Sequence, residues 1–312
     1  LVLEPTSDRE AILSALEKLS AGGSTAGGEG IKAAYKLAED SFIKNGNNRI
    51  ILATDGDFNV GVSSDGAMKR LIEEKRKTGV FLTCLGFGMG NYKDSKMETL
   101  ADAGNGNYAY IDNLLEAKKV LVTEMGGTLV TIAKDVKIQV EFNPQLVASY
   151  RLVGYENRLL NDEDFNDDKK DAGEIGAGHT VTALYEIIPV GPNSKSSVDD
   201  LKYQKSENKT QFGEELLTVK FRYKEPKESR SKLITVALNS YVAPKEYLSK
   251  NYMFSAAVAE FGMLLRGSEF KENATFDSVL ELAKKSKGKD ENGYRAEFIN
   301  LVRLAKEIYK VG

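Results

Sequence analysis

Two oxygen-bearing side chains in the first third of the chain have the chemistry to bind a hard cation. Asp55 follows the apolar run 49–54 in a Thr-Asp-Gly sequence, and Thr25 lies in the glycine-rich stretch 21–28. If the apolar run is a strand of an open parallel sheet, Asp55 lies just beyond its carboxyl end, where ligand sites collect. Hydroxyl and carboxylate oxygens suit Mg²⁺, which keeps several of its waters. Taken alone, the two residues identify no metal site, since Thr25 could equally cap a helix and Asp55 could equally form a turn.

A second acidic cluster lies in the polar loop 161–178. Asp162, Asp164, Asn166 and Asp168 alternate as calcium ligands do. The glycine and the glutamate that an EF-hand needs at its sixth and twelfth positions are absent, so the loop is not an EF-hand. The sequence leaves two alternatives for this segment: a solvated acidic loop or a weak calcium site.

The remaining motifs favour no enzyme. Gly86 and Gly88 follow an apolar run as in a dinucleotide-binding fingerprint, but Asn91 stands where the third glycine belongs. The chain has one histidine, His179, and one cysteine, Cys84. We expect the histidine to open a strand in a structural role and the cysteine to be an inert core thiol. No nucleophile, base and oxyanion donors come together, so we predict a non-catalytic protein.

Composition excludes several other classes. The chain has 312 residues and a formal net charge of −3, with 43 Lys and Arg against 46 Asp and Glu. Neither the basic nor the acidic residues form long blocks in the sequence, and this weakens the interpretation as a nucleic-acid-binding protein. No apolar run approaches the ~18–20 residues that cross a bilayer. A single cysteine leaves no internal disulfide.

The elements that must position these residues change character along the chain. The first 130 residues alternate helical and strand patterns, which is typical of a parallel α/β sheet with helices on both faces. A Ser7–Glu10 capping box opens the first helix. Further helices are expected to end near residue 42 and to span 65–77, 94–103 and 113–131, with strands at 49–54, 80–85 and 107–111. The first two strands are predicted to be buried on both faces. Three strands are too few for a doubly wound domain, so we expect the rest of the sheet upstream of Leu1.

From residue 134 the apolar period changes to two. This alternation predicts half-buried antiparallel strands of a β-sandwich at 136–142, 146–153, 179–188, 216–223 and 233–238. Helical spacing returns at 254–265, 276–287 and 294–309. The predicted domains are an incomplete α/β domain at 1–131, a β-sandwich at 132–250 and a helical C-terminal region at 251–312.

Three stretches resemble a von Willebrand factor type A domain: Gly22-Gly23-Ser24-Thr25, the run 49–59 and Leu85-Gly86-Phe87-Gly88. The segments 53–61 and 172–180 are similar, more narrowly, to one bacterial branch of that family. Members of this branch are uncharacterised proteins, described as related to calcium-activated chloride channels and often as lipoproteins. They carry a C-terminal domain of unknown function, which residues 254–305 resemble.

The resemblance implies a metal-ion-dependent adhesion site. In the family this site is built from an Asp-x-Ser-x-Ser loop after the first strand, a threonine from a later loop and an aspartate at a strand end. Thr25 and Asp55 match the last two. The Asp-x-Ser-x-Ser element is nowhere in the chain, and in the family it would precede Leu1. We therefore expect an N-terminally truncated chain that binds Mg²⁺ or another divalent cation weakly or not at all, whereas the full-length protein would bind it.

The function that the resemblance implies is a non-catalytic, metal-dependent protein-binding module of a bacterial cell-envelope protein. Its partner would be a protein that presents a carboxylate to the metal ion. The protein would be extracytoplasmic, either periplasmic or anchored by lipid. The alternative is a metal-independent scaffold protein of an envelope assembly.

Overall fold

A computed structural model describes residues 1–20, 27–55, 65–90, 92–155, 159–170, 172–191, 213–240 and 248–311. The chain divides into two compact units, each made of several chain segments. The first unit comprises 1–138, 163–180 and 221–234, and the second comprises 139–162, 181–220 and 235–312. The division into three domains at 131 and 250 stays a prediction.

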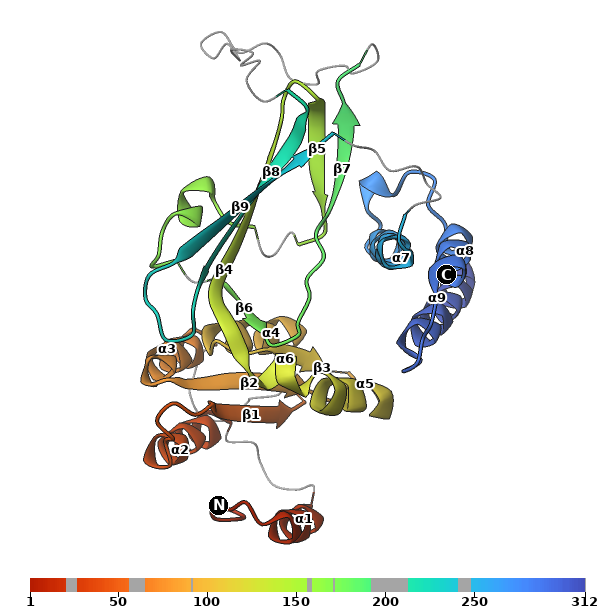
Figure 1. Ribbon diagram of the computed structural model, residues 1–312. Coiled ribbons are helices and arrows are strands. Elements are labelled where there is room, and N and C mark those ends of the chain that lie inside the picture. The colour runs from red at the N-terminus through yellow and green to blue at the C-terminus, as the bar shows by residue number, and fades with distance from the viewer. Residues whose placement is uncertain are drawn as a thin grey trace. The chain divides into compact units, whose positions relative to one another are not determined.

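The first unit contains a parallel sheet of three strands. These are β1 (Asn48–Thr54), β2 (Val80–Gly86) and β3 (Tyr108–Tyr110), in the order β1-β2-β3. Helix α3 (Asp65–Lys75), continued by a 3₁₀ turn, and helix α4 (Asp94–Ala103) connect successive strands (Figure 1). Gly79 ends the first connection at φ +90°, a left-handed conformation that favours glycine. The predicted α/β class and all three predicted strands are confirmed.

Helices cover both faces of this sheet, as expected. On one face, α2 (Gly27–Asp40), α3 and α4 pack on β2 through Ile31, Tyr35, Met68, Ile72, Met97, Leu100, Val80, Leu82 and Cys84. On the other face, Val120 packs against Leu85 and Ile111. Val120 lies in a π-helical turn between α5 (Leu114–Lys118) and α6 (Met125–Leu129), so the continuous helix predicted at 113–131 is broken into three pieces.

Two expectations for the N-terminal elements are wrong. β1 is not buried on both faces: Ile51 is 47% exposed, because among the described strands β1 pairs only with β2 and forms an edge. The first helix, α1 (Arg9–Glu17), is capped by Asp8 rather than by Ser7, since the Asp8 carboxylate accepts hydrogen bonds from the Glu10 and Ala11 amides. No residue of α1 is buried.

Two separate antiparallel sheets follow. The larger has the order β6-β4-β8-β9, formed by β6 (Gly173–Gly176), β4 (Thr131–Phe142), β8 (Glu215–Lys224) and β9 (Lys232–Asn239). The smaller pairs β5 (Val147–Val153) with β7 (Leu184–Pro189). The ring of Phe142 on β4 lies 4.4 Å from Tyr150 and 5.4 Å from Tyr185, centroid to centroid, so the two sheets contact each other there.

Three details of these sheets differ from the prediction. β6 lies inside the segment 161–178, which was expected to be a loop throughout. The strand expected to open at His179 begins at Leu184, and His179 is exposed in the turn after β6. β9 is exposed along its whole length rather than half-buried, because it is an edge strand with neither face covered.

The C-terminal helices α7 (Lys250–Leu265), α8 (Phe276–Ser286) and α9 (Tyr294–Val311) lie in the second unit and match the predicted ranges closely. Their core contains Ala257, Val279, Leu280, Ala283, Ile299 and Val302. The apolar residues of α9 are only partly covered: Val302 is fully buried, but Ile308 is 70% exposed. Within the described ranges, no helix is both long and apolar enough to cross a membrane.

Candidate functional site

Asp55 lies where the sequence predicted, one residue beyond the carboxyl end of β1, and it is exposed. The loop after β2 lies directly beside it. The Phe87 amide donates a hydrogen bond of 2.9 Å to the Thr54 carbonyl. Gly88 has φ +86°, and a Cβ placed there would be 3.7 Å from the Cβ of Asp55. The ends of two neighbouring strands thus form one edge, with Asp55 at its surface.

Three tyrosines support this edge. The Tyr110 hydroxyl donates to the Gly88 carbonyl, and the Tyr110 ring lies 4.9 Å from that of Tyr92. The hydroxyls of Tyr92 and Tyr108 are 2.8 Å apart, and Tyr108 donates to Asp94. Burial raises the pKa of both Tyr92 and Tyr108, so their hydroxyls stay protonated. The tyrosines fix the loop that contacts Asp55.

Sequence reasoning missed these tyrosines, although a signal was present. Tyr108 and Tyr110 stand two residues apart on a strand, which places both side chains on one face of the sheet. Gly86 is required for a related reason: a Cβ at this position would lie 1.7 Å from the Tyr92 hydroxyl. Glycine at position 86 therefore makes room for the Tyr92 side chain, and this close packing, not the binding of a nucleotide phosphate, explains it.

The described residues do not complete a metal site. Thr25 and the residues just after Asp55 lie outside the described ranges, so the pairing of Thr25 with Asp55 stays a prediction. Asp112 is also exposed, two residues beyond the end of β3 on the same sheet. Within the described part of the chain, no three or more His, Cys, Asp or Glu side chains gather closely enough to hold a metal ion. Asp55 contributes one oxygen ligand, and a bound Mg²⁺ requires others.

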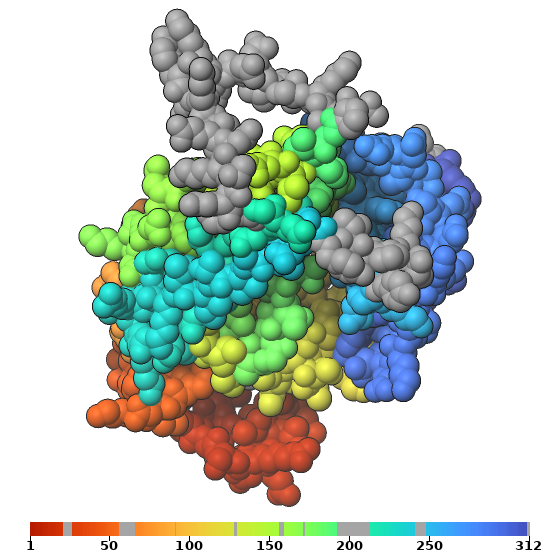
Figure 2. All heavy atoms as spheres, turned by 45° about the horizontal axis from the view of Figure 1, so that its top comes forward, coloured from red at the N-terminus to blue at the C-terminus, as the bar shows by residue number. Residues whose placement is uncertain are grey.

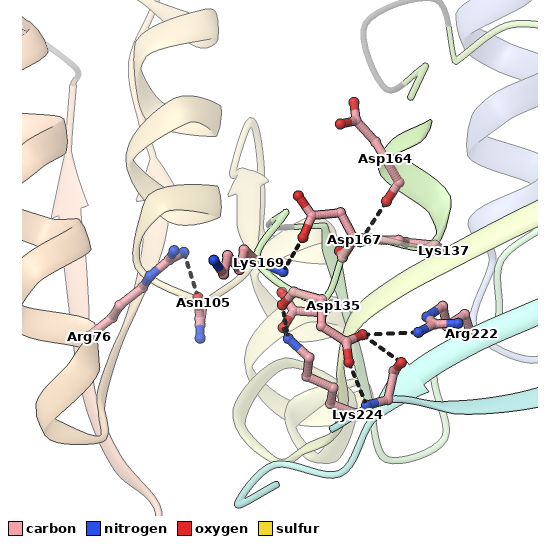
Figure 3. Close-up of polar contacts among 11 residues, drawn as sticks. Arg76, Asn105, Asp135, Lys137, Asp164, Asp167, Lys169, Arg222 and Lys224 are labelled. Carbon is pink, nitrogen blue, oxygen red and sulfur yellow. Dashed lines mark hydrogen bonds and ion pairs between the residues drawn. The ribbon is translucent and has the colours of Figure 1, made fainter. Parts of the chain in front are cut away.

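The acidic loop, which we define as 162–170, is organised differently (Figure 3). It opens with a 3₁₀ turn, Asp162–Phe165. Lys137 of β4 lies beneath it and is only 2% exposed. The Lys137 ammonium donates to the Asp164 carbonyl at 2.9 Å and to the Asp167 carbonyl. Burial lowers the pKa of Lys137, and two carbonyl acceptors compensate for part of the lost hydration. The loop is solvated outside and bound to a lysine inside.

A second buried lysine binds the far end of the acidic loop. Lys224 of β8 is 6% exposed, and its ammonium lies 2.6 Å from both the Asp135 carboxylate and the Asp168 carbonyl. The Asp168 carboxylate accepts from the Ser231 hydroxyl at 2.6 Å and pairs with Arg222 at 3.3 Å. These hydrogen bonds, that of Ser231 foremost, lower the pKa of Asp168 to about 2. The alternating acids of the sequence are thus joined to the antiparallel sheet.

The structure confirms that Cys84 is a core thiol, as predicted. Its side chain is fully buried in β2, and burial raises the pKa of the thiol to about 12. A thiol that stays protonated in a closed core is neither a nucleophile nor a metal ligand.

The parallel sheet covered by helices on both faces belongs to the α/β class, and the model of the von Willebrand factor type A domain matches residues 2–122. The first part of the chain is therefore a type A domain. The family described as "Uncharacterized protein YfbK, C-terminal" matches residues 127–308, and the chain belongs to it. A type A domain indicates a protein-interaction module, and such domains often bind a divalent metal ion.

Among known proteins, the uncharacterised protein YfbK of Escherichia coli (strain K12) is 45% identical over 302 residues, which is 96% of this chain. The chain spans about half, 52%, of the length of that relative. Two solved structures are more distant. A von Willebrand factor type A protein from Catenulispora acidiphila aligns with a TM-score of 0.42 and 17% identity, over 95% of this chain and 66% of that one. The human COPII-coat protein Sec24c aligns with a TM-score of 0.37 and 10% identity, over 82% and 34%.

Proposed function

We propose that this chain forms the scaffold of a metal-ion-dependent protein-binding module, in which Asp55 and Thr25 are two of the metal ligands. The remaining ligands would come from an Asp-x-Ser-x-Ser loop elsewhere in the full-length protein. The metal ion would keep an open coordination position for a carboxylate of a protein partner. The module would work without catalysis, outside the cytoplasm, in a bacterial cell-envelope protein.

The observation that carries this proposal is the exposed position of Asp55 at an edge fixed by tyrosines. A residue that only formed a turn would not need the neighbouring loop to be fixed beside it through Tyr110 and Gly88. A metal ligand does need this, because coordination requires oxygens at defined positions before the ion arrives.

Electrostatics also favour a cation at this edge. Asp55 and Asp112 are both exposed beyond the ends of strands in one sheet. Two carboxylates repel a third carboxylate from a partner, so direct binding of an acidic partner is unfavourable. A divalent ion bound at Asp55 would reverse the sign of that interaction.

Calorimetric titration of Mg²⁺ and Mn²⁺ into the full-length protein and its Asp55→Ala variant tests the proposal. We expect the variant to lose metal affinity by at least about tenfold, or roughly 1.4 kcal/mol. Asp112→Ala is the matched control, because it removes the same charge from the same edge without removing a proposed ligand. Equal affinities of the wild type and Asp55→Ala, or equal losses in both variants, would overturn the proposal.

The metal-independent scaffold role is the second candidate, and one observation favours it. β9 offers an exposed apolar edge that belongs to a different sheet from the strand that precedes Asp55. Under this role Asp55→Ala would leave all binding unchanged, and the antiparallel sheet would form the assembly contacts.

A further inference from the structure

Strand β9 is an exposed edge strand. Within the described part of the chain it pairs only with β8, at the end of the order β6-β4-β8-β9. All of its residues are exposed, including four large apolar ones: Leu233 at 51%, Ile234 at 49%, Val236 at 53% and Leu238 at 49%. Successive side chains of a strand point to opposite faces, so neither face of β9 is covered. Figure 2 shows the segment of β8 and β9, turquoise to cyan, on the side toward the viewer.

The β9 edge lacks the features that keep sheet edges apart. Natural edge strands carry inward-pointing charges, prolines or bulges, or are very short. From Leu233 to Asn239 the strand has no charge, no proline and no glycine. Its one charged residue, Lys232, lies at the end and pairs within its own chain with Glu225 and, at 3.6 Å, with Glu228. The strand therefore presents an uncharged row of backbone donors and acceptors.

We propose that β9 pairs antiparallel with β9 of a second copy of this chain, joining two four-stranded sheets into one. An antiparallel pair of identical strands is related by a two-fold axis, the commonest symmetry of soluble oligomers. An uncharged strand also has no charge pattern with which to select a different protein. Self-pairing uses only what the strand itself presents.

The sequence of β9 is complementary to itself in this orientation. The two-fold axis must pass a residue that lies opposite itself, because opposite side chains share a face of the sheet. With Val236 opposite Val236 of the second copy, Ile234 faces Leu238 and Thr235 faces Ala237. Three apolar pairs, Val236 with Val236 and Ile234 with Leu238 twice, then lie on one face, and Lys232 faces Ser240 rather than another lysine. Cross-strand apolar pairs of this kind each stabilise a sheet by roughly 0.2–1 kcal/mol.

The opposite edge of the same sheet explains why the pairing stops at two copies. β6 is only four residues long, which by itself blunts a sheet edge, and its end packs closely on the backbone of α6. A Cβ at Gly176 would lie 1.6 Å from the Gly127 carbonyl oxygen. With β6 this short, each sheet offers one long open edge among the described strands, and the assembly closes as a dimer instead of growing into a fibre.

The expected dimer is weak. A single strand pair with its flanking side chains is smaller than the ~800 Å² per partner of a standard stable interface. We therefore expect a dissociation constant of roughly 1–100 µM.

Sedimentation velocity of this chain over roughly 1–200 µM tests the proposal. The wild type should shift from monomer to dimer across this range. Val236→Lys should stay monomeric throughout, because it places one charge from each copy beside the two-fold axis. Val236 is already half-exposed, so the variant should keep the wild-type circular dichroism spectrum and melting temperature.

Leu304→Lys on α9 is the matched control, since Leu304 is 62% exposed and the substitution adds the same charge far from β9 in the sequence. It should dimerise like the wild type. A wild type that is monomeric at the highest concentration would overturn the proposal, whatever the variants do. So would a Val236→Lys variant that dimerises as the wild type does, because the contact would then lie on another face.

Discussion

Two regions of this protein carry the acidic residues that the sequence offers as cation ligands, and the structure holds them differently. In the acidic loop 162–170, the almost fully buried Lys137 and Lys224 bind backbone carbonyls, and Arg222 pairs with the Asp168 carboxylate. The edge at Asp55 is exposed and is formed by backbone and tyrosine contacts. An acidic cluster whose oxygens already bind buried ammonium groups has a structural role. An exposed carboxylate on a fixed edge is the better candidate for an external ion.

The largest effect that follows from this comparison concerns Lys224. Replacing it with methionine leaves the Asp135 carboxylate buried without its partner, and breaking such a pair costs about 3 kcal/mol in the free energy of unfolding. Urea denaturation of Lys224→Met measures the loss. Adding Asp135→Asn should recover part of it, because the stranded charge is then removed while asparagine tolerates φ +51° at that position.

Lys220→Met is the matched control for this measurement. Lys220 lies on the same strand and pairs with Glu141 at 3.4 Å, but the Glu141 side chain is 70% exposed. Exposed pairs contribute at most about 1 kcal/mol. Equal losses in Lys220→Met and Lys224→Met would mean that the buried lysines do not organise the acidic loop, and the comparison would fail.

The sequence predicted the parallel sheet well, because an apolar run such as 80–85 has few other interpretations. It could not predict that β1 is half-exposed and β9 fully exposed, since both strands are as apolar as buried ones. The burial of a strand depends on what pairs with it or covers it, and the strand's own sequence does not specify those neighbours.

The candidate site was predictable to a similar degree. The position of Asp55 followed from the rule that ligand sites lie at the carboxyl ends of parallel strands. The role of the acidic loop did not follow from its own residues. Its cations, Lys137 and Lys224, lie 27 residues before Asp164 and 56 residues after Asp168 in the chain. Such long-range pairs leave no local pattern in a single sequence.

A smaller effect is expected at the other region. Tyr110→Phe removes the hydrogen bond to the Gly88 carbonyl, which is worth about 1 kcal/mol and corresponds to about a fivefold change in local opening. Hydrogen exchange of the Phe87 amide, which is bound to the Thr54 carbonyl, reports this opening. Exchange should accelerate in Tyr110→Phe and stay unchanged in Tyr150→Phe, whose ring lies in the second unit. Equal exchange in Tyr110→Phe and the wild type would show that Tyr110 does not fix the edge.

The smallest effect should be that of calcium on the acidic loop, where we expect none. The carbonyls of Asp164 and Asp167 already accept from Lys137, so a Ca²⁺ ion would have to displace a buried ammonium group to reach them. Millimolar Ca²⁺ should therefore leave the melting temperature of this chain within about 1 °C and leave hydrogen exchange across 162–170 unchanged. A calcium-dependent rise in melting temperature that Asp164→Asn abolishes would contradict this expectation. Such a rise would mean that the loop binds an ion together with Lys137. The presence of a buried ammonium group would then not distinguish a structural acidic cluster from a metal site in this protein.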